Sequence, residues 1–191
     1  ESTAVLAGNS LLTMAFEILS NKNLYLSEKT KVNLINKLSE CSGHLGIAGG
    51  QYLDLNYEKK KVSRNKIIEM EMKKTGMLFS FCCVAPAIIK NKKNLELRFF
   101  ENVGSDIGLL FQISDDLIDH EGNSKIAGKK TGKDQKKGKA TLISLLGYDN
   151  AVKYSEDLII NIDKKLQKYG SNSKKIKQTL EYILNRDRWH K

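Results

Sequence analysis

Apolar residues recur at the three- and four-residue spacing of an α-helix along most of the chain. The first such pattern covers residues 1–19, and a second covers residues 27–55, starting at Ser27, a residue type that caps helices. A third begins at Ser63 and reaches residue 73, and an apolar helix follows over residues 77–89. No stretch of useful length alternates as a strand would, so the pattern predicts an all-α fold.

The longest apolar pattern follows a connection over residues 91–95 and predicts a largely buried helix that ends in acidic residues. The acids are Asp115, Asp116 and Asp119, of which the first and the last share one face. Like charges four residues apart destabilise an isolated helix by about a few tenths of a kcal/mol, so this group requires a counter-ion. The apolar positions before the acids are Phe99, Val103, Ile107, Leu110 and Phe111.

A loop rich in lysine comes directly after these acids and contains Lys129, Lys133 and Lys139, with glycines between them. Carboxylates on a rigid helix suit Mg²⁺, which often bridges carboxylates to substrate phosphates, and lysines supply compact positive charge for those phosphates. The alternative interpretation is an acidic helix end beside a solvated basic loop.

Glycines inside the helical patterns point to places where helices approach closely. Gly43, Gly46 and Gly50 lie in the second pattern, where each costs about 1 kcal/mol relative to alanine. Close helix packing, or access for a substrate, would offset that cost. The tripeptide Lys74-Thr75-Gly76 separates two helical runs, and we expect a break there that brings a lysine and a hydroxyl to an interior cavity.

Two further amphipathic helices are predicted in the last quarter of the chain, one after Gly147 and one near the C-terminus. Gly170 is a residue type that follows a helix end. The chain then ends in a basic tail over residues 185–191. The apolar positions of these helices are Val152, Leu158, Ile159, Ile162, Leu166, Ile176, Leu180, Ile183 and Leu184.

The charge of the chain suggests an anionic partner. It has 191 residues and a formal net charge of +10, which is compatible with nucleic-acid binding. Its lysines, however, are spread over loops and helix surfaces, and aromatic residues are not interleaved with them as a base-stacking surface requires. We therefore favour a small polyanionic substrate, or a lysine-biased composition, over nucleic acid.

Other features of the composition favour a cytoplasmic protein. No apolar run reaches the length of a membrane span, and the first residues lack the basic start of a signal peptide. Cys41, Cys82 and Cys83 lie in apolar helical patterns without the spacing of a zinc site or a disulfide framework. We expect them to be reduced thiols in the core.

The acidic helix end and the loop after it resemble a known motif. The pattern F-Q-x-x-D-D-x-x-D, followed by G-K-x-x-G-x-D-x-x-x-G-K-x-T, is similar to the second aspartate-rich region of the trans-polyprenyl diphosphate synthases, which include farnesyl and geranylgeranyl diphosphate synthases. The matching residues are Phe111, Gln112, Asp115, Asp116, Asp119, Gly128, Lys129, Gly132, Asp134, Gly138, Lys139 and Thr141.

Three earlier segments resemble the same family in the same order: residues 1–17, the pattern G-Q-x-x-D-L over residues 50–55, and Lys74-Thr75-Gly76. In the family, the first of these follows another aspartate-rich motif, which has no counterpart in this sequence. We expect the sequence to be incomplete at the N-terminus. The alternative is a diverged, non-catalytic subunit of a heteromeric prenyl diphosphate synthase.

The resemblance implies an all-α, isoprenoid-synthase-type helical bundle around a central cavity, as a single domain over residues 1–191. It implies a Mg²⁺-dependent prenyltransferase that condenses an allylic diphosphate with isopentenyl diphosphate, head to tail, and releases diphosphate. The product would be short, such as farnesyl or geranylgeranyl diphosphate, and the enzyme a homodimer without a membrane span. Nucleic-acid binding and a purely scaffolding role are the hypotheses from other classes.

The resemblance also implies roles for individual residues. Asp115 and Asp116 would bind Mg²⁺, with Asp119 in support, and the leaving diphosphate would accept the proton. Gln112 and Thr75 would line the reacting carbons or stabilise the cation. The residues implied to bind substrate are Lys74, Lys129, Lys139, Gln51, Asp54 and, in the basic tail, Arg186 or Arg188.

Overall fold

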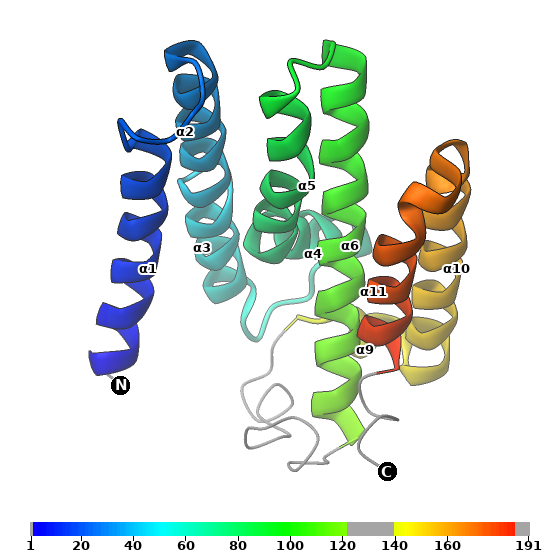
Figure 1. Ribbon diagram of the computed structural model, residues 1–191. Coiled ribbons are helices and arrows are strands. Elements are labelled where there is room, and N and C mark those ends of the chain that lie inside the picture. Colours follow the sequence, from blue (N-terminus) through cyan, green and yellow to red (C-terminus); the bar gives the residue numbers. More distant parts are fainter. Residues whose placement is uncertain (1, 122–139, 186–191) are drawn as a thin grey trace.

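The computed structural model describes residues 2–121 and 140–185, and every regular element in them is helical. The helices stand side by side as a bundle, with the long helix α6 in the middle (Figure 1). The elements are α1 (Ser2–Ser20), α2 (Glu28–Ser42), α3 (Ile47–Tyr57), α4 (Arg64–Glu71), the π-helical turn η1 (Met72–Gly76), α5 (Met77–Ile89), α6 (Asn94–Glu121), α9 (Leu142–Leu146), α10 (Tyr148–Leu166), the 3₁₀ segment η2 (Gln167–Ser173) and α11 (Lys174–Leu184).

The predicted central helix is α6, and its apolar face forms the core of the bundle. Val103, Leu110 and Ile113 are 0% exposed and Ile107 is 5% exposed. They pack in one cluster with residues of α4, α9, α10 and α11, while α5 makes the most extensive helix–helix contact with α6. Each side chain of this size stabilises the fold by about 1.5–3 kcal/mol when fully buried, so α6 is a rigid support for the acids at its end.

The predicted single helix over residues 27–55 is wrong, because the chain turns at its glycines. Helix α2 ends at Ser42, and α3 starts at Ile47. Gly46 has φ −115° and ψ −124°, and a Cβ built there would lie 1.9 Å from the carbonyl oxygen of Cys41. Glycine therefore allows a sharp turn that lays α3 beside the following helices.

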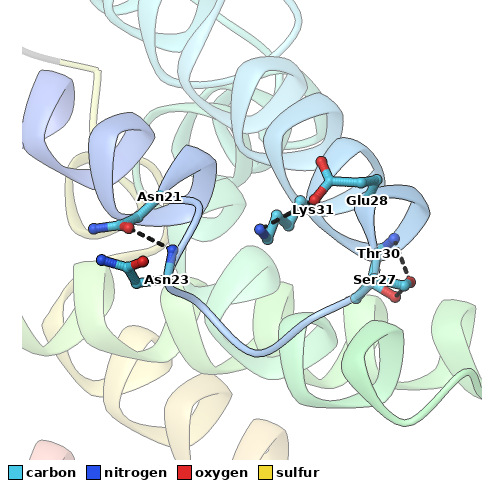
Figure 2. Close-up of polar contacts among 6 residues, drawn as sticks. All are labelled: Asn21, Asn23, Ser27, Glu28, Thr30 and Lys31. Carbon is cyan, nitrogen blue, oxygen red and sulfur yellow. Dashed lines mark hydrogen bonds and ion pairs between the residues drawn. The ribbon is translucent and has the colours of Figure 1, made fainter.

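The link between α1 and α2 is held by local polar contacts (Figure 2). The predicted cap is present, since Ser27 Oγ accepts a hydrogen bond from the Thr30 backbone N–H at 3.2 Å. The ammonium group of the buried Lys31 lies 3.3 Å from the carboxylate of the exposed Glu28, so the lysine charge is paired at the edge of the core. At the next predicted cap, Ser63 has the extended backbone of an N-cap but makes no side-chain capping bond among the described residues.

Helix α1 forms where the pattern predicts it, but its apolar face is not in the core. Leu6 and Leu11 are 64% and 65% exposed, and only residues near its end, such as Phe16 and Leu19, are half-buried. The helix contacts α2. Among the described residues, nothing covers the rest of its apolar face.

The expectation that no apolar segment reaches the length of a membrane span is wrong when only the length and composition of the helices are considered. The helical stretches Ser2–Ser20 and Arg64–Ile89 are both long and apolar enough to cross a membrane. The second arises because η1 joins α4 and α5 into one continuous helix, which the sequence pattern does not anticipate. Core helices of soluble proteins share these properties, and α5 packs against α6 and α2.

The cysteines only partly match the predicted core positions. All three are free; Cys41 is buried and Cys83 half-buried, whereas Cys82 is exposed. Burial raises the pKa of the Cys83 thiol to about 11, so this side chain is neutral near pH 7.

The last quarter contains the two predicted helices, α10 and α11, and a short helix that the pattern misses. This helix, α9, begins with a capping box in which Thr141 Oγ1 accepts from the Ser144 N–H and Ser144 Oγ accepts from the Thr141 N–H. Gly147 and Gly170 have φ of 80° and 52°, values that favour glycine and allow the chain to reverse between helices.

Glycines also let backbones meet where α3, η1 and α6 cross. A Cβ at Gly108 would lie 2.4 Å from Gly76 Cα, and one at Gly50 would lie 2.2 Å from the backbone nitrogen of Lys74. Both distances are well inside van der Waals contact. The π-helical turn is thus pressed between α3 on one side and α6 on the other.

We expect Gly108→Ala to lower the free energy of unfolding by about 1–3 kcal/mol, because the added methyl group must push η1 away from α6. The matched control is Gly8→Ala in α1, where a Cβ meets nothing within 4 Å. Alanine there should be neutral or stabilising, by at most about 1 kcal/mol. Urea unfolding followed by circular dichroism measures both, and equal stability of the two variants would contradict the close packing.

Candidate active site where α3, η1 and α6 meet

The tripeptide Lys74-Thr75-Gly76 does not break the helix as predicted; it forms most of the π-helical turn η1. A π-helical turn inserts an extra residue into an α-helix and so changes the direction of the side chains around it, often at functional sites. Here Lys74 faces α3 and Thr75 faces α6, as their hydrogen bonds show. The expectation that the tripeptide brings a lysine to an interior cavity is confirmed for Lys74, whereas Thr75 lies beside that cavity, bonded to Gln112.

The Lys74 ammonium is paired with Asp54 of α3, at 2.5 Å between Nζ and Oδ2. Asp54 is 7% exposed, and Gln51, one turn earlier, reaches the same carboxylate oxygen at 3.5 Å. Three residues that the sequence assigns to substrate binding therefore lie together. Their proximity follows from Gly50, whose missing side chain lets α3 touch the backbone at Lys74.

A second chain of hydrogen bonds connects η1 to the acids on α6. Thr75 Oγ1 donates to the amide oxygen of Gln112 at 2.8 Å, and the amide nitrogen of Gln112 donates to Asp116 Oδ1 at 2.9 Å. The oxygen and the nitrogen of the Gln112 amide are thus both hydrogen-bonded, and the two bonds together fix the orientation of the amide group. Asp116 is held in one orientation by a residue that is itself anchored to the neighbouring helix.

The acids at the end of α6 lie within the protein rather than on its outer face. Asp116 and Asp119 are 6% and 5% exposed, and Asp115 is half-buried. Buried carboxylates on a rigid helix require positive charge nearby. The predicted ligands are therefore in a suitable environment for a cation.

The donor set fits Mg²⁺ held together with a substrate. Within residues 2–121 and 140–185, no three His, Cys, Asp or Glu side chains are grouped closely enough to hold a metal ion by themselves. Mg²⁺ is commonly bound through one or two carboxylates, with water and substrate phosphate oxygens in its other positions. Asp116, oriented by Gln112 and close in sequence to Asp115, matches that mode rather than a metal cage built by protein alone.

The Asp54–Lys74 pair and the Gln112–Asp116 pair both border one small cavity. Its volume is about 20 Å³, room for about one water molecule. Three acids and one lysine converge there, so negative charge predominates. The described residues lining it are Asp54, Met70, Glu71, Lys74, Gln112, Asp116, Ala140 and Thr141.

The sequence analysis missed Glu71, the last residue of α4, which is 2% exposed. Burial, together with the nearby Asp116 carboxylate, raises the pKa of Glu71 well above its usual range, although a backbone hydrogen bond from Leu142 and the charge of Lys74 act in the other direction. The sequence feature that could have indicated a buried Glu71 is its position on the same helix face as the apolar residues Ile67 and Met70.

The remaining predicted site residues, Lys129, Lys139, Arg186 and Arg188, lie outside the described residues. The structure therefore brings together Gln51, Asp54, Lys74, Thr75, Gln112 and Asp116, with Asp115 and Asp119 on the same stretch of α6.

Comparison with known proteins gives a consistent family. The polyprenyl synthetase family model matches residues 1–183. The farnesyl diphosphate synthase of Micrococcus luteus is 34% identical over 188 residues, and that of Escherichia coli K12 is 33% identical over 193 residues. Each match covers 98% of this chain but 64% of the relative, so the chain spans a little under two thirds of the length of these curated relatives.

Solved structures agree with these matches. The structure of a Helicobacter pylori geranyltransferase complexed with magnesium and isoprenyl diphosphate has a TM-score of 0.81 at 30% identity, over 97% of this chain and 60% of that one. An FPP/GFPP synthase from Zymomonas mobilis has a TM-score of 0.80 at 34% identity, over 96% of this chain and 61% of that one. The all-helical fold of the described residues is thus that of isoprenyl diphosphate synthases.

The pairing of Lys74 with Asp54 should contribute to stability. We expect Lys74→Met to lower the free energy of unfolding by about 1–3 kcal/mol, since it leaves the buried Asp54 carboxylate without its cation. Lys73→Met is the control, because Lys73 pairs with Glu69 in an exposed i,i+4 bridge, and should cost no more than about 0.5 kcal/mol. Chemical denaturation of both variants compares them; equal costs would show that the buried pair is not a structural contact.

The pH dependence of stability should reveal Glu71. Because the pKa of Glu71 is higher in the folded than in the unfolded chain, the folded chain binds more protons in the interval between the two values. Protonation of Glu71 therefore stabilises the fold at low pH, and this stabilisation is lost as pH rises from about 4.3, the unfolded value, through the folded pKa. Glutamine does not titrate. The unfolding free energy of Glu71→Gln, relative to the wild type, should therefore grow with pH in this window.

Glu69→Gln is a control of opposite sign, because hydrogen bonding and charge from Lys73 lower the pKa of Glu69. Its stabilising contribution is present above the unfolded pKa and is lost as pH falls through the folded one. Urea unfolding between about pH 3 and pH 8 measures both variants. Curves for wild type and Glu71→Gln that run parallel would refute a raised pKa at Glu71.

Proposed function

The chain belongs to the polyprenyl synthetase family, and on that premise we propose that it is a Mg²⁺-dependent prenyltransferase. It joins an allylic diphosphate to isopentenyl diphosphate, head to tail, and releases diphosphate. The observation that carries the proposal is the linked set Asp54–Lys74 and Thr75–Gln112–Asp116 at one cavity. These residues come from three helices, and each was singled out by the family pattern.

The reaction places its main demand on charge stabilisation. The carbon–oxygen bond of the allylic diphosphate breaks, and both electrons leave with the diphosphate. The double bond of isopentenyl diphosphate then forms a bond to the allylic cation, and a proton passes from the adjacent carbon to the released diphosphate, which restores a double bond. Preorganised positive charge near the diphosphate lowers the barrier to the first step.

In this proposal Lys74 supplies part of that charge. At about 4 Å and an effective dielectric constant near 20, one unit-charge contact contributes up to about 4 kcal/mol. Asp54 holds the ammonium group in place before substrate arrives. Lys129 and Lys139 supply further positive charge to the diphosphate.

Asp115 and Asp116, with Asp119 in support, hold Mg²⁺, which neutralises diphosphate charge when bound. Gln112 positions Asp116 through its amide nitrogen, while its bond from Thr75 keeps the amide facing the reacting carbons. Gln51 lies beside the Asp54–Lys74 pair, and in this proposal it binds substrate. Arg186, in the C-terminal tail, contacts the homoallylic substrate.

The wider properties of the enzyme are part of the same proposal, because the chain spans 64% of the length of its first relatives. The relatives named farnesyl diphosphate synthase support a short-chain product. We propose a single catalytic domain that acts as a homodimer in the cytoplasm.

The metal-binding assignment predicts that Asp115→Ala and Asp116→Asn each lower Mg²⁺-dependent turnover by about 100-fold or more, because charge stabilisation of the diphosphate is lost. Asp106→Asn is the matched control on the same helix, where the carboxylate pairs with Lys165. It should leave turnover within about 3-fold of the wild type. The assay combines dimethylallyl, geranyl or farnesyl diphosphate with isopentenyl diphosphate, and product length is read by chromatography.

Calorimetry with a non-hydrolysable allylic diphosphate analogue, with and without Mg²⁺, completes the test. Mg²⁺-dependent binding without turnover would favour the non-catalytic subunit of a heteromeric synthase. Absence of such binding, or a steeply salt-dependent affinity for nucleic acid in its place, would refute the proposed function.

A further inference from the structure

Ser114 of α6 lies between Gln112 and the acids Asp115 and Asp116, and the proposed chemistry gives it no role. It is 3% exposed, and its Oγ donates a hydrogen bond to the backbone carbonyl oxygen of Ile183 at 2.7 Å. Ile183 belongs to α11, 69 positions further along the chain. The contact therefore joins the acid-bearing stretch of α6 to α11.

The direction of this bond is unusual for a serine inside a helix. Such a hydroxyl commonly bonds to a carbonyl three or four residues earlier in its own helix. The buried Ser155 does so in α10, where its Oγ donates to the Val152 carbonyl at 2.6 Å. Ser114 instead reaches the last turn of α11, where carbonyl groups have no N–H partner within the helix. Because Ile183 is 4% exposed, the donor for this carbonyl comes from the protein rather than from bulk water.

The hydrogen bonds of Gln112 and Ser114 leave α6 on opposite sides. At about 100° per residue, two positions along an α-helix lie about 200° apart, so Ser114 points away from Gln112. Asp116 lies within about 40° of Gln112 and shares its side of the helix. In Figure 1, α11 runs along the side of α6 away from α5, the helix that continues η1. One turn of α6 is thus held from both sides, by η1 through Thr75 and by α11 through Ser114.

Such a double attachment fixes the rotation of α6 about its own axis. A helix with its side chains is about 10–12 Å in diameter, so a rotation of about 10° moves a carboxylate at its surface by about 1 Å. Metal–ligand distances tolerate a change of only about 0.2 Å. The apolar contacts of α6 are non-directional, whereas a hydrogen bond sets a distance and an angle. The bond from Ser114 therefore helps to define where the Asp116 carboxylate points.

We propose that Ser114 is a positioning residue, whose hydroxyl fastens α6 to the last turn of α11 and so sets the rotation of α6 that directs Asp116 toward the cavity. It contacts neither substrate nor metal and acts through the helix that carries the acids. Its effect on Mg²⁺-assisted diphosphate binding rests on the proposed function, but the bond between α6 and α11 does not.

Three single substitutions separate this role from a general loss of packing. Ser114→Ala removes the hydroxyl that crosses to α11. Ser155→Ala is the matched control, because Ser155 is 0% exposed and its hydrogen bond stays within α10. Ser114→Thr keeps a hydroxyl at position 114. A positioning role requires a loss of diphosphate affinity in Ser114→Ala alone, whereas a purely structural role requires the two alanine variants to behave alike.

The first measurement is amide hydrogen exchange in the full chain without ligand, by NMR. The reporter is Asn185, whose N–H donates to the Glu181 carbonyl in the last turn of α11 at 3.0 Å, and the buried Leu38 of α2 is the internal reference. Exchange at Asn185 should be about tenfold faster in Ser114→Ala, because this turn loses its anchor, and unchanged in Ser155→Ala and Ser114→Thr. An unchanged rate at Asn185 in Ser114→Ala would overturn the anchoring.

The second measurement is calorimetric binding of inorganic diphosphate with Mg²⁺. Affinity should fall about tenfold in Ser114→Ala, as for other groups that orient a metal site indirectly, and stay within about threefold of the wild type in Ser155→Ala and Ser114→Thr. Equal affinities of the two alanine variants would overturn the positioning role.

Should Ser114→Ala fail to fold, Ser114→Thr decides. Wild-type affinity and wild-type exchange at Asn185 in that variant support the role of the hydroxyl, and a loss of either overturns it. If the wild type itself does not bind diphosphate, the proposed function fails, while the exchange experiment still decides whether Ser114 anchors α11.

Discussion

The close approach of three backbones around η1 is the constraint on which the rest of this structure depends. Gly50 lets α3 reach the chain at Lys74, and Gly108 lets α6 reach Gly76. A side chain at either glycine would separate the helices by more than a hydrogen bond can span. Because the backbones touch, short side chains such as Asp54 and Thr75 can bridge the helices, and polar groups far apart in sequence become direct partners.

The second consequence of that packing is an unbalanced charge. Asp54, Glu71 and Asp116 surround the single cation Lys74 among the described residues that line the cavity. Two of these acids, Asp54 and Asp116, are oriented by hydrogen bonds to neighbouring residues, and the third, Glu71, is buried beside them. Such a group is stable only with further positive charge or a bound proton. A site of this kind suits a divalent cation that arrives together with a polyanionic substrate.

Much of the fold and of the site followed from the sequence. The apolar spacing around Val103 and Leu110 predicted α6, and Ser27 marked the start of α2 correctly. Local rules failed where the chain departs from regular α-helix. Gly46 divides a predicted single helix because its backbone leaves the helical region, and the segment ending in Gly76 forms a π-helical turn instead of a break. Both outcomes depend on neighbouring helices that a local pattern does not contain.

The sequence alone determined the all-helical class, the family and the types of residue that carry the chemistry, because helical periodicity and an ordered set of motifs are properties of the chain itself. Tertiary structure decided which of those residues are partners. It joined Lys74 to Asp54 across 20 positions and Thr75 to Gln112 across 37. It also revealed Glu71, whose importance comes from its burial at the same cavity. Burial and long-range hydrogen bonds arise from packing between helices, and spacing along one helix does not encode them.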